Sequence, residues 1–227
     1  MQSPWSAEHG SATPVEMPLV VDDPACVRWD DVCDVLVAGF GAAGACAALE
    51  AAAAGAKVRI VERFEGGGAS AKSGGVVYAG GGTRYQTEAG YNDTPEAMFA
   101  YLRQEVGDAV SAATLKRFCA GSVDMLRWLE RLGVRFAASV PPRKTSYPQN
   151  SYYLYYSGNE AVGDGAREYA PAPRGHRVVG DGMSGRVLYD TLRRAVDAHL
   201  FIDTMCHASV RRLVTDRSGR VIGAQVW

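Results

Sequence analysis

A short apolar run at residues 35–38 and the residues that follow it predict a strand–helix–strand unit. Val35-Leu36-Val37-Ala38 has the length of a buried strand, and the alanine-rich stretch after it stops at Gly55, where a helix would end. A second apolar run, 57–61, completes the unit. A strand, a helix and a second strand in this order are typical of an α/β fold with a parallel sheet.

Beyond this unit the pattern becomes mostly helical and finishes in a hairpin. Start signals and apolar positions at three- and four-residue steps predict three helices: one from Thr94-Pro95-Glu96, one from Ser111 to Gly133, and one over 186–198 after Ser184. The apolar stripe of the second helix is expected in the core: Leu115, Phe118, Cys119, Met125, Leu126 and Leu129. Two strand-like runs, 210–215 and 221–227, flank a turn at 216–219 and predict a β-hairpin.

Three segments lack a regular period. Residues 1–32, rich in Pro, Ser, Asp and Glu, are predicted to be an N-terminal extension, mobile or lying along the surface, ahead of a domain at 33–227. The Gly-rich loop 66–75 takes the place of a helix and leads into a short strand at 76–78. Residues 137–183 are irregular, and a segment of that length inside a compact domain is usually functional.

Composition and charge exclude several classes of protein. The chain is 47 % hydrophobic with a net charge of −1, so nothing indicates binding to nucleic acid or to an anionic membrane. The five cysteines and four histidines are dispersed without a CxxC pair, so we expect free thiols and no metal site. No apolar run reaches the length of a membrane span, and no signal-peptide pattern is present, so a cytoplasmic location is predicted.

The turn after the first strand carries the candidate chemistry. Gly39-x-Gly41-x-x-Gly44 provides a tight turn at Gly39, a close approach of a pyrophosphate to the backbone at Gly41, and close packing of helix and strand at Gly44. The helix N-terminus offers N–H groups and a positive dipole end to phosphates. Glu62, at the end of the second strand, is placed to hold ribose hydroxyls. The stretch is therefore interpreted as a dinucleotide-binding unit.

This unit alone does not separate NAD from FAD. An NAD domain would continue into a further βαβ unit, whereas this chain enters the loop 66–75, whose small residues let the backbone approach a flat, extended cofactor. Ser70 and Ser73 are candidate donors to phosphate or ring oxygens in that loop. The alternative interpretation is a flexible surface loop.

Several motifs resemble the flavoproteins of the fumarate reductase and succinate dehydrogenase superfamily. They are the GxGxxG turn, Glu62, Gly68-Ala69-Ser70, Ser73-Gly74-Gly75 and the helix start 181–188. The runs 74–83, 156–160 and 170–176 resemble more closely the 3-ketosteroid Δ4-(5α)-dehydrogenase branch. The resemblance implies a Rossmann-like FAD-binding domain, built from a βαβ start, a helical insert and a β-hairpin. The resemblance also implies that this domain is incomplete, because the family's capping domain and C-terminal segment would lie beyond residue 227.

The resemblance also implies which residues hold FAD: Gly39, Gly41, Ala42, Ala43, Gly44, Glu62, Arg63, Gly68, Ala69, Ser70, Ser73, Gly74, Gly75 and, through its backbone at the adenine edge, Val210. Succinate dehydrogenases carry a flavin-linked histidine where this chain has Ala69, so the FAD is expected to be non-covalent. The implied activity is oxidation of a CH–CH bond in a small apolar keto substrate such as a 3-ketosteroid. The family's catalytic residues lie outside the chain, so none can be named, and a second polypeptide is a candidate partner.

Four residues are candidates for the substrate, each with a structural alternative. Tyr156 either lines an apolar cavity or belongs to an ordinary strand; Arg174 and His176 either bind a carboxylate or ketone or are solvated. Ser184 either faces the flavin or caps a helix. Two other functions stay open: a fumarate reductase-like enzyme acting on a small unsaturated acid, which would need converging arginines, and a non-catalytic FAD-binding subunit that works with a partner.

Overall fold

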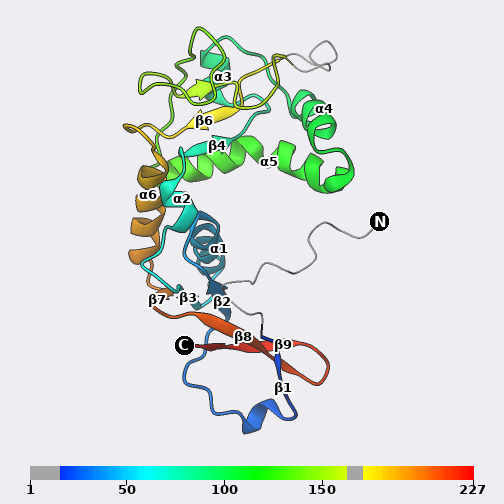
Figure 1. The fold of residues 1–227 in the computed structure, drawn as a ribbon, viewed down its shortest axis with the longest axis vertical. Coiled ribbons are helices and arrows are strands. Elements are labelled where there is room, and N and C mark those ends of the chain that lie inside the picture. The colour runs from blue at the N-terminus through cyan, green and yellow to red at the C-terminus, as the bar shows by residue number, and fades with distance from the viewer. Residues whose placement is uncertain (1–15, 163–170) are drawn as a thin grey trace, which may run out of the picture. The chain divides into compact units, whose positions relative to one another are not determined.

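The computed structural model of the protein describes residues 16–162 and 171–227, drawn in colour in Figure 1. These residues form two compact units. The first contains residues 16–40, 47–66 and 200–227, and the second contains residues 41–46, 67–162 and 171–199. Each unit is built around its own sheets and helices.

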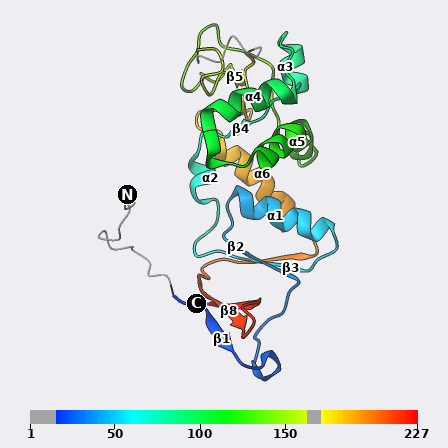
Figure 2. The ribbon, with the colours of Figure 1, turned by 90° about the vertical axis from the view of Figure 1, so that its right-hand side faces the viewer.

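A parallel sheet in the first unit contains the predicted strand–helix–strand element. Strand β2 (Val35–Ala38) pairs with β3 (Val58–Val61), and β3 pairs with β7 (Ile202–Met205), in the order β2-β3-β7. Helix α1 (Ala42–Ala53) joins β2 to β3, and the chain turns out of it at Gly55, whose φ is +91°. Figure 2 shows this succession, which confirms the predicted α/β fold with a Rossmann-like start. Strand β7 escaped prediction because Asp203 and Thr204 interrupt its apolar pattern.

The second sheet of this unit holds the predicted hairpin. Strand β8 (Val210–Asp216) runs antiparallel to β9 (Val221–Val226) on either side of Gly219, whose φ is +83°. Strand β1 (Leu19–Val21) pairs with β8 in parallel, followed by a 3-10 turn η1 (Pro24–Cys26). Part of the segment 1–32 therefore joins the sheet, and the predicted boundary at 32 does not separate it. Three apolar residues give no periodic signal, and their partner lies almost 200 residues away in sequence.

The second unit is mainly helical, with one small antiparallel sheet in the order β4-β6-β5. Its elements are α2 (Gly68–Lys72), β4 (Val76–Tyr78), α3 (Arg84–Glu88), α4 (Pro95–Val106), η2 (Gly107–Ala109), α5 (Ala112–Arg131), β5 (Leu154–Tyr155), β6 (Gly175–Arg177) and α6 (Gly185–Asp197). The predicted strand at 76–78 is confirmed as β4. The irregular segment 137–183 contributes β5 and β6.

All three predicted helices of this unit form, and side-chain caps confirm the starts of α4 and α5, whereas Ser184 makes no side-chain cap at α6. The Thr94 side chain accepts a hydrogen bond from the Ala97 N–H, and that of Ser111 accepts one from the Thr114 N–H. The structure adds two short helices that the pattern did not predict. Helix α2 lies within the loop 66–75. Helix α3 begins at a capping box, in which the side chains of Thr83 and Gln86 each accept a hydrogen bond from the other residue's backbone N–H. Both span only five residues, too few for apolar periodicity to emerge.

The core of the second unit includes the predicted stripe of α5. Leu115, Cys119, Leu126 and Leu129 are buried, together with Met98 of α4 and Tyr189 of α6. The prediction fails for Phe118, which is exposed, and Met125 is only half-buried. The buried stripe on a 20-residue helix is therefore narrower than the sequence pattern indicates.

Candidate functional site

The glycine-rich turn leads directly from β2 into α1. Gly39 has a φ of +99°, a left-handed conformation that favours glycine, and its N–H donates to the Val61 carbonyl at 2.8 Å. The N–H of Ala45 donates to the Gly41 carbonyl at 3.0 Å and is the first amide satisfied within the helix. Amides before it have no intrahelical acceptor, so the turn presents N–H groups of the type that bind phosphate.

Ser70 lies against this helix start. Its Oγ accepts a hydrogen bond from the Ala42 N–H at 3.1 Å, although the two residues are 28 positions apart. A Cβ built on Gly41 would lie 3.4 Å from the same oxygen, so only a residue without a side chain leaves this space open. The hydroxyl accepts from Ala42 and keeps its own hydrogen to donate. Ser70 therefore replaces the Ala42 N–H with a hydroxyl donor at the α1 N-terminus.

Glu62 is fixed by two backbone amides at the carboxyl end of β3. Its Oε2 accepts from the Phe40 N–H at 2.7 Å, and its Oε1 accepts from the Phe64 N–H at 3.0 Å. The Glu62 backbone pairs with the segment after β7: its N–H donates to Met205 and its carbonyl accepts from Ala208, both at 2.9 Å. Each carboxylate oxygen retains acceptor capacity, so the side chain is held ready for two further hydroxyl donors.

Val210 is the first residue of β8, in the same unit as Glu62. Its neighbour Ser209 exchanges both backbone hydrogen bonds with Trp227, at 2.7 and 2.9 Å. In an antiparallel pair the next residue directs its N–H and C=O away from the partner strand, and β1 meets β8 only from Val214 onward. The Val210 backbone thus offers an N–H donor and a C=O acceptor at the edge of the strand. An adenine ring, which carries an acceptor and a donor along one side, can pair with both groups.

The loop from Gly68 to Gly75 packs against the start of α6. The Gly185 N–H donates to the Ser73 carbonyl at 3.0 Å, and the Ser73 hydroxyl donates to the Ser70 carbonyl at 2.8 Å. Ser184 is buried, and its hydroxyl donates to the Gly74 carbonyl at 3.1 Å without capping α6. Gly75, with a φ of +64°, approaches the Ser184 backbone so closely that a Cβ would lie 2.5 Å from its carbonyl carbon.

Arg174 and His176 lie inside the second unit. The Arg174 guanidinium donates from Nε and Nη2 to Asp93 at 2.9 and 2.6 Å, and both side chains are fully buried. Burial alone would raise the pKa of Asp93, but the bonds from Arg174 and from the Gly81 N–H outweigh it and lower that pKa. The predicted alternative of solvated loop residues is wrong for both.

His176 is held by two hydrogen bonds that define its tautomer. Nδ1 lies 3.2 Å from the Arg174 carbonyl, which can only accept, so Nδ1 carries the hydrogen. Nε2, at 2.9 Å, therefore accepts from the Thr83 hydroxyl. Burial lowers the pKa of His176 to about 4, so the ring is neutral at pH 7.

A tyrosine–glutamate pair that the sequence did not single out lies beside them. The Tyr78 hydroxyl donates to Glu160 Oε1 at 3.1 Å, and the Gly158 N–H donates to Oε2 at 3.0 Å. Burial raises the pKa of Glu160, and burial followed by the charge of Glu160 raises that of Tyr78. Tyr156 is half-buried and meets the Tyr91 ring edge-on at 6.1 Å. An acid shortly after the tyrosine-rich run 152–156 was the available signal for Glu160.

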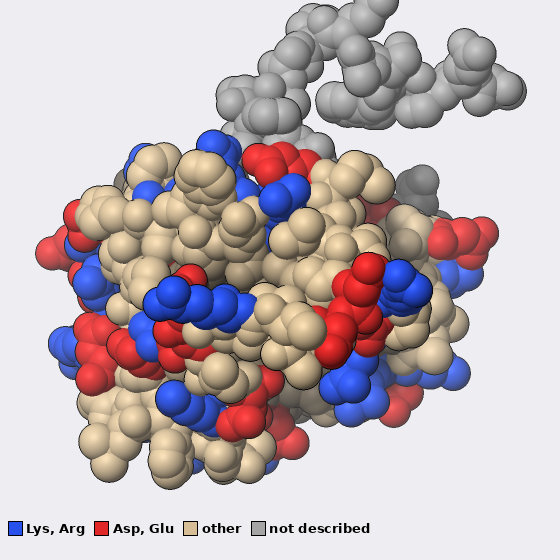
Figure 3. Space-filling view, turned by 90° about the horizontal axis from the view of Figure 1, so that it is seen from below, with Lys and Arg blue, Asp and Glu red and all other residues tan. Residues whose placement is uncertain are grey.

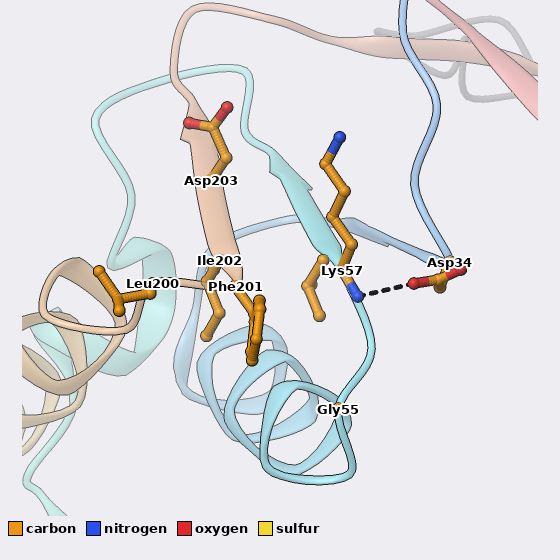
Figure 4. Close-up of a pocket in the computed structure, with 8 residues that line it drawn as sticks. Asp34, Gly55, Lys57, Leu200, Phe201, Ile202 and Asp203 are labelled. Carbon is orange, nitrogen blue, oxygen red and sulfur yellow. Dashed lines mark hydrogen bonds between the residues drawn. The ribbon is translucent and has the colours of Figure 1, made fainter.

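A cavity and the charged surface of the described residues do not point to a particular ligand. A cavity of about 280 Å³ lies at the amino ends of β2, β3 and β7, lined by residues such as Lys57, Phe201 and Asp203 (Figure 4). Glu62 and the glycine turn follow the carboxyl ends of these strands, where ligands of open α/β sheets bind. Basic and acidic side chains are interspersed on the face drawn in Figure 3.

The described residues offer neither a metal cluster nor a membrane-spanning helix. Within 16–162 and 171–227, His, Cys, Asp and Glu form no group suited to a metal ion. Among the helices of the same ranges, none is both long and apolar enough to cross a membrane.

Steroid dehydrogenases and a fumarate reductase are among the known proteins to which this chain is similar. The chain is 49 % identical over 206 residues to a 3-oxo-5-alpha-steroid 4-dehydrogenase of Comamonas testosteroni, covering 88 % of the chain and 38 % of that protein. The structure of the 3-ketosteroid-Δ4-(5α)-dehydrogenase from Rhodococcus jostii RHA1 in complex with 4-androstene-3,17-dione matches with a TM-score of 0.87 and 35 % identity, over 92 % of the chain and 44 % of that protein.

A flavocytochrome c3 fumarate reductase in an open conformation matches with a TM-score of 0.65 and 27 % identity, over 87 % of this chain and 30 % of its own. The resemblance predicted from the motifs is confirmed. The chain spans less than half the length of these relatives.

The residues present fit FAD: in the second unit the helix start and Ser70 provide donors for a pyrophosphate, and in the first unit the anchored Glu62 provides acceptors for a ribose. The model of the FAD binding domain family matches residues 34–227, nearly the whole of the predicted domain. On the strength of this match and of its relatives, the chain belongs to the FAD binding domain family.

Proposed function

We propose that the chain supplies the FAD-binding part of an oxidoreductase that dehydrogenates a CH–CH bond in a 3-ketosteroid-like substrate. The observation that carries this proposal is the Glu62 carboxylate anchored to the glycine turn at Phe40, in a chain 49 % identical to a steroid 4-dehydrogenase. When bound, FAD supplies the two-electron acceptor, while the protein supplies binding, orientation and acid–base groups.

The proposed FAD contacts divide by chemical group. Amides of the α1 start and the Ser70 hydroxyl bind the pyrophosphate, Glu62 accepts from the ribose hydroxyls, and the Val210 backbone meets the adenine edge. The loop from Gly68 to Gly75 is proposed to contact the flavin. The full set is Gly39, Gly41, Ala42, Ala43, Gly44, Glu62, Arg63, Gly68, Ala69, Ser70, Ser73, Gly74, Gly75 and Val210.

Attachment of the FAD is proposed to be non-covalent. Ala69 has a methyl side chain with no nucleophilic atom, and it occupies the position that resembles the flavin-linked histidine of succinate dehydrogenases. A cytoplasmic location and a partner polypeptide also remain proposals.

The assignment of Tyr156, Arg174, His176 and Ser184 to the substrate stays a prediction. We favour a ketosteroid-like substrate over a small unsaturated acid because Arg174, the one arginine considered for a carboxylate, already pairs with Asp93. The catalytic acid and base remain unassigned and are proposed to come from the region that completes the length of the relatives, on the same or on a second polypeptide.

The test uses the complete protein, meaning this chain together with that region. Acid precipitation should release yellow FAD into the supernatant, and flavin fluorescence that stays with the precipitate would contradict non-covalent attachment. Gly41→Val should abolish FAD binding, because its methyl groups fill the space beside Ser70. Glu62→Ala should weaken it by about 1–3 kcal/mol, the range for hydrogen bonds to a charged group.

Activity separates the enzyme from a non-catalytic FAD-binding subunit. A 3-ketosteroid and an artificial electron acceptor are supplied to the complete protein and to the 227-residue chain by itself. We expect turnover by the complete protein and none by the 227-residue chain. Turnover by the chain alone would place catalytic groups within it, with the region around Tyr78, Tyr156 and Glu160 examined first.

A further inference from the structure

Phe64 presents an exposed ring on a fixed backbone, two residues after Glu62. Its side chain is 62 % exposed. Its N–H donates to Glu62 Oε1 at 3.0 Å, and its carbonyl accepts from the His207 N–H at 3.3 Å. A single exposed aromatic residue is ordinary on a protein surface, but here both backbone groups are hydrogen-bonded, and the N–H bonds the carboxylate of Glu62 in the proposed cofactor site.

A second contact locks the same turn. His207 has a φ of +55°, the only positive value among the non-glycine residues that the structure describes, and this conformation is uncommon outside glycine. Its Nε2 lies 2.7 Å from Glu65 Oε1. Because Glu65 follows β3 and His207 follows β7, the pair joins the turns at the carboxyl ends of two adjacent strands. The ring of Phe64 is therefore held at a defined place on this edge.

Arg63 lies over the same ring. Its guanidinium carbon is 4.7 Å from the Phe64 ring centroid, in the geometry of a cation–π contact. Arg63 is itself exposed, so the two neighbouring side chains form a flat, cationic and aromatic surface beside the carboxylate assigned to the ribose. Nucleobases stack on aromatic rings and on guanidinium planes, and such surfaces accept them without hydrogen bonds.

We propose that Phe64, backed by Arg63, is a stacking platform for the purine base of the bound dinucleotide. This inference rests on the proposed FAD site and specifies its adenine end. The base is attached to the ribose assigned to Glu62, only two residues from Phe64, and the Val210 backbone offers its edge a donor and an acceptor. Platform, ribose acceptor and backbone edge all belong to the first unit.

The chain provides a matched control for an exposed phenylalanine. Phe201, 54 % exposed, precedes the amino end of β7, the strand whose other end leads to His207. It lines the cavity of Figure 4, at the opposite edge of the parallel sheet from Glu62. Replacing it removes a ring of the same size and of similar exposure from the same unit without touching the proposed platform.

The experiment measures the dissociation constants of FAD and of ADP for the complete apoprotein by isothermal titration. Phe64→Ala should weaken both at least about fivefold, the lower limit for loss of one base–aromatic stack. Phe64→Tyr should restore binding, and Phe201→Ala should leave it unchanged. FMN, which lacks the adenosine, should bind wild type and Phe64→Ala equally.

The outcomes distinguish failure of the proposed FAD site from failure of the proposed stacking platform at Phe64. If wild type binds neither FAD nor ADP, or if Gly41→Val binds as wild type does, the proposed FAD site itself fails. If wild type binds and Phe64→Ala binds equally well, the stacking platform is refuted and the site stands. Equal losses in Phe64→Ala and Phe201→Ala would also refute it, because the effect would then be general destabilisation.

Discussion

Gly185→Ala tests whether the start of α6 must lie directly against the loop from Gly68 to Gly75. A Cβ on Gly185 would lie 2.5 Å from the Ser73 Oγ, and closer still to the backbone carbonyl oxygens of Ser70 and Ser73. Two of these three atoms belong to the backbone and cannot rotate away. The substitution therefore has to push α6 from the loop that holds the Ser70 hydroxyl on the Ala42 amide.

The cost follows from three contributions. Overpacking of a tight contact costs about 1–3 kcal/mol. Loss of the hydrogen bond from the Gly185 N–H to Ser73, 3.0 Å long, adds about 1 kcal/mol. The higher helix propensity of alanine than of glycine offsets up to about 1 kcal/mol of this loss of stability. We expect a net loss of about 1–4 kcal/mol in the free energy of unfolding, and weaker FAD binding because Ser70 moves with its loop.

Urea unfolding followed by circular dichroism measures the first effect, and flavin content after dialysis measures the second. Gly121→Ala is the matched control, because Gly121 lies in α5 and a Cβ added to it would have nothing within 4 Å. This control should stabilise the protein by about 0.5–1 kcal/mol and leave flavin content unchanged. A Gly185→Ala variant with wild-type stability and full flavin content would refute the close-packing argument.

Two further predictions concern the buried polar groups. His176 has a folded-state pKa of about 4, below its usual value near 6.5. Its contribution to the free energy of unfolding is therefore complete above pH 6.5 and is lost as the pH falls toward 4. The loss, about 3 kcal/mol, should appear in urea unfolding between about pH 7.5 and 4.5 and be reduced in His176→Gln; equal pH dependence in both proteins would contradict it. Asp93→Asn should cost about 3–5 kcal/mol because it leaves the Arg174 charge buried without its partner, whereas Asp190→Asn, in an exposed pair, should cost less than about 1 kcal/mol. Similar losses in the two Asp→Asn variants would show that burial does not control the cost.

The elements that the sequence determined are those whose causes are local. Residues 33–62 encode the βαβ unit in one continuous stretch, and the left-handed turn at Gly39 follows from the residue type itself. The starts of α4 and α5 follow from caps whose donor and acceptor lie three residues apart. The β8–β9 hairpin needs only a short turn between two apolar runs. The resemblance to FAD-binding flavoproteins rests on the same local motifs.

Tertiary structure decided every feature that depends on partners distant in sequence. Leu19–Val21 becomes a strand because β8 pairs with it, and β7 forms against β3 although its own pattern is mixed. Sequence motifs place Ser70 near a cofactor but cannot show that its hydroxyl accepts from Ala42. Arg174 and His176 have the sequence surroundings of loop residues, yet both are buried because Asp93 and Thr83 supply the hydrogen bonds that a polar interior requires. Spacing along the chain carries no information about such contacts, because only the folded backbone brings their atoms within hydrogen-bonding distance.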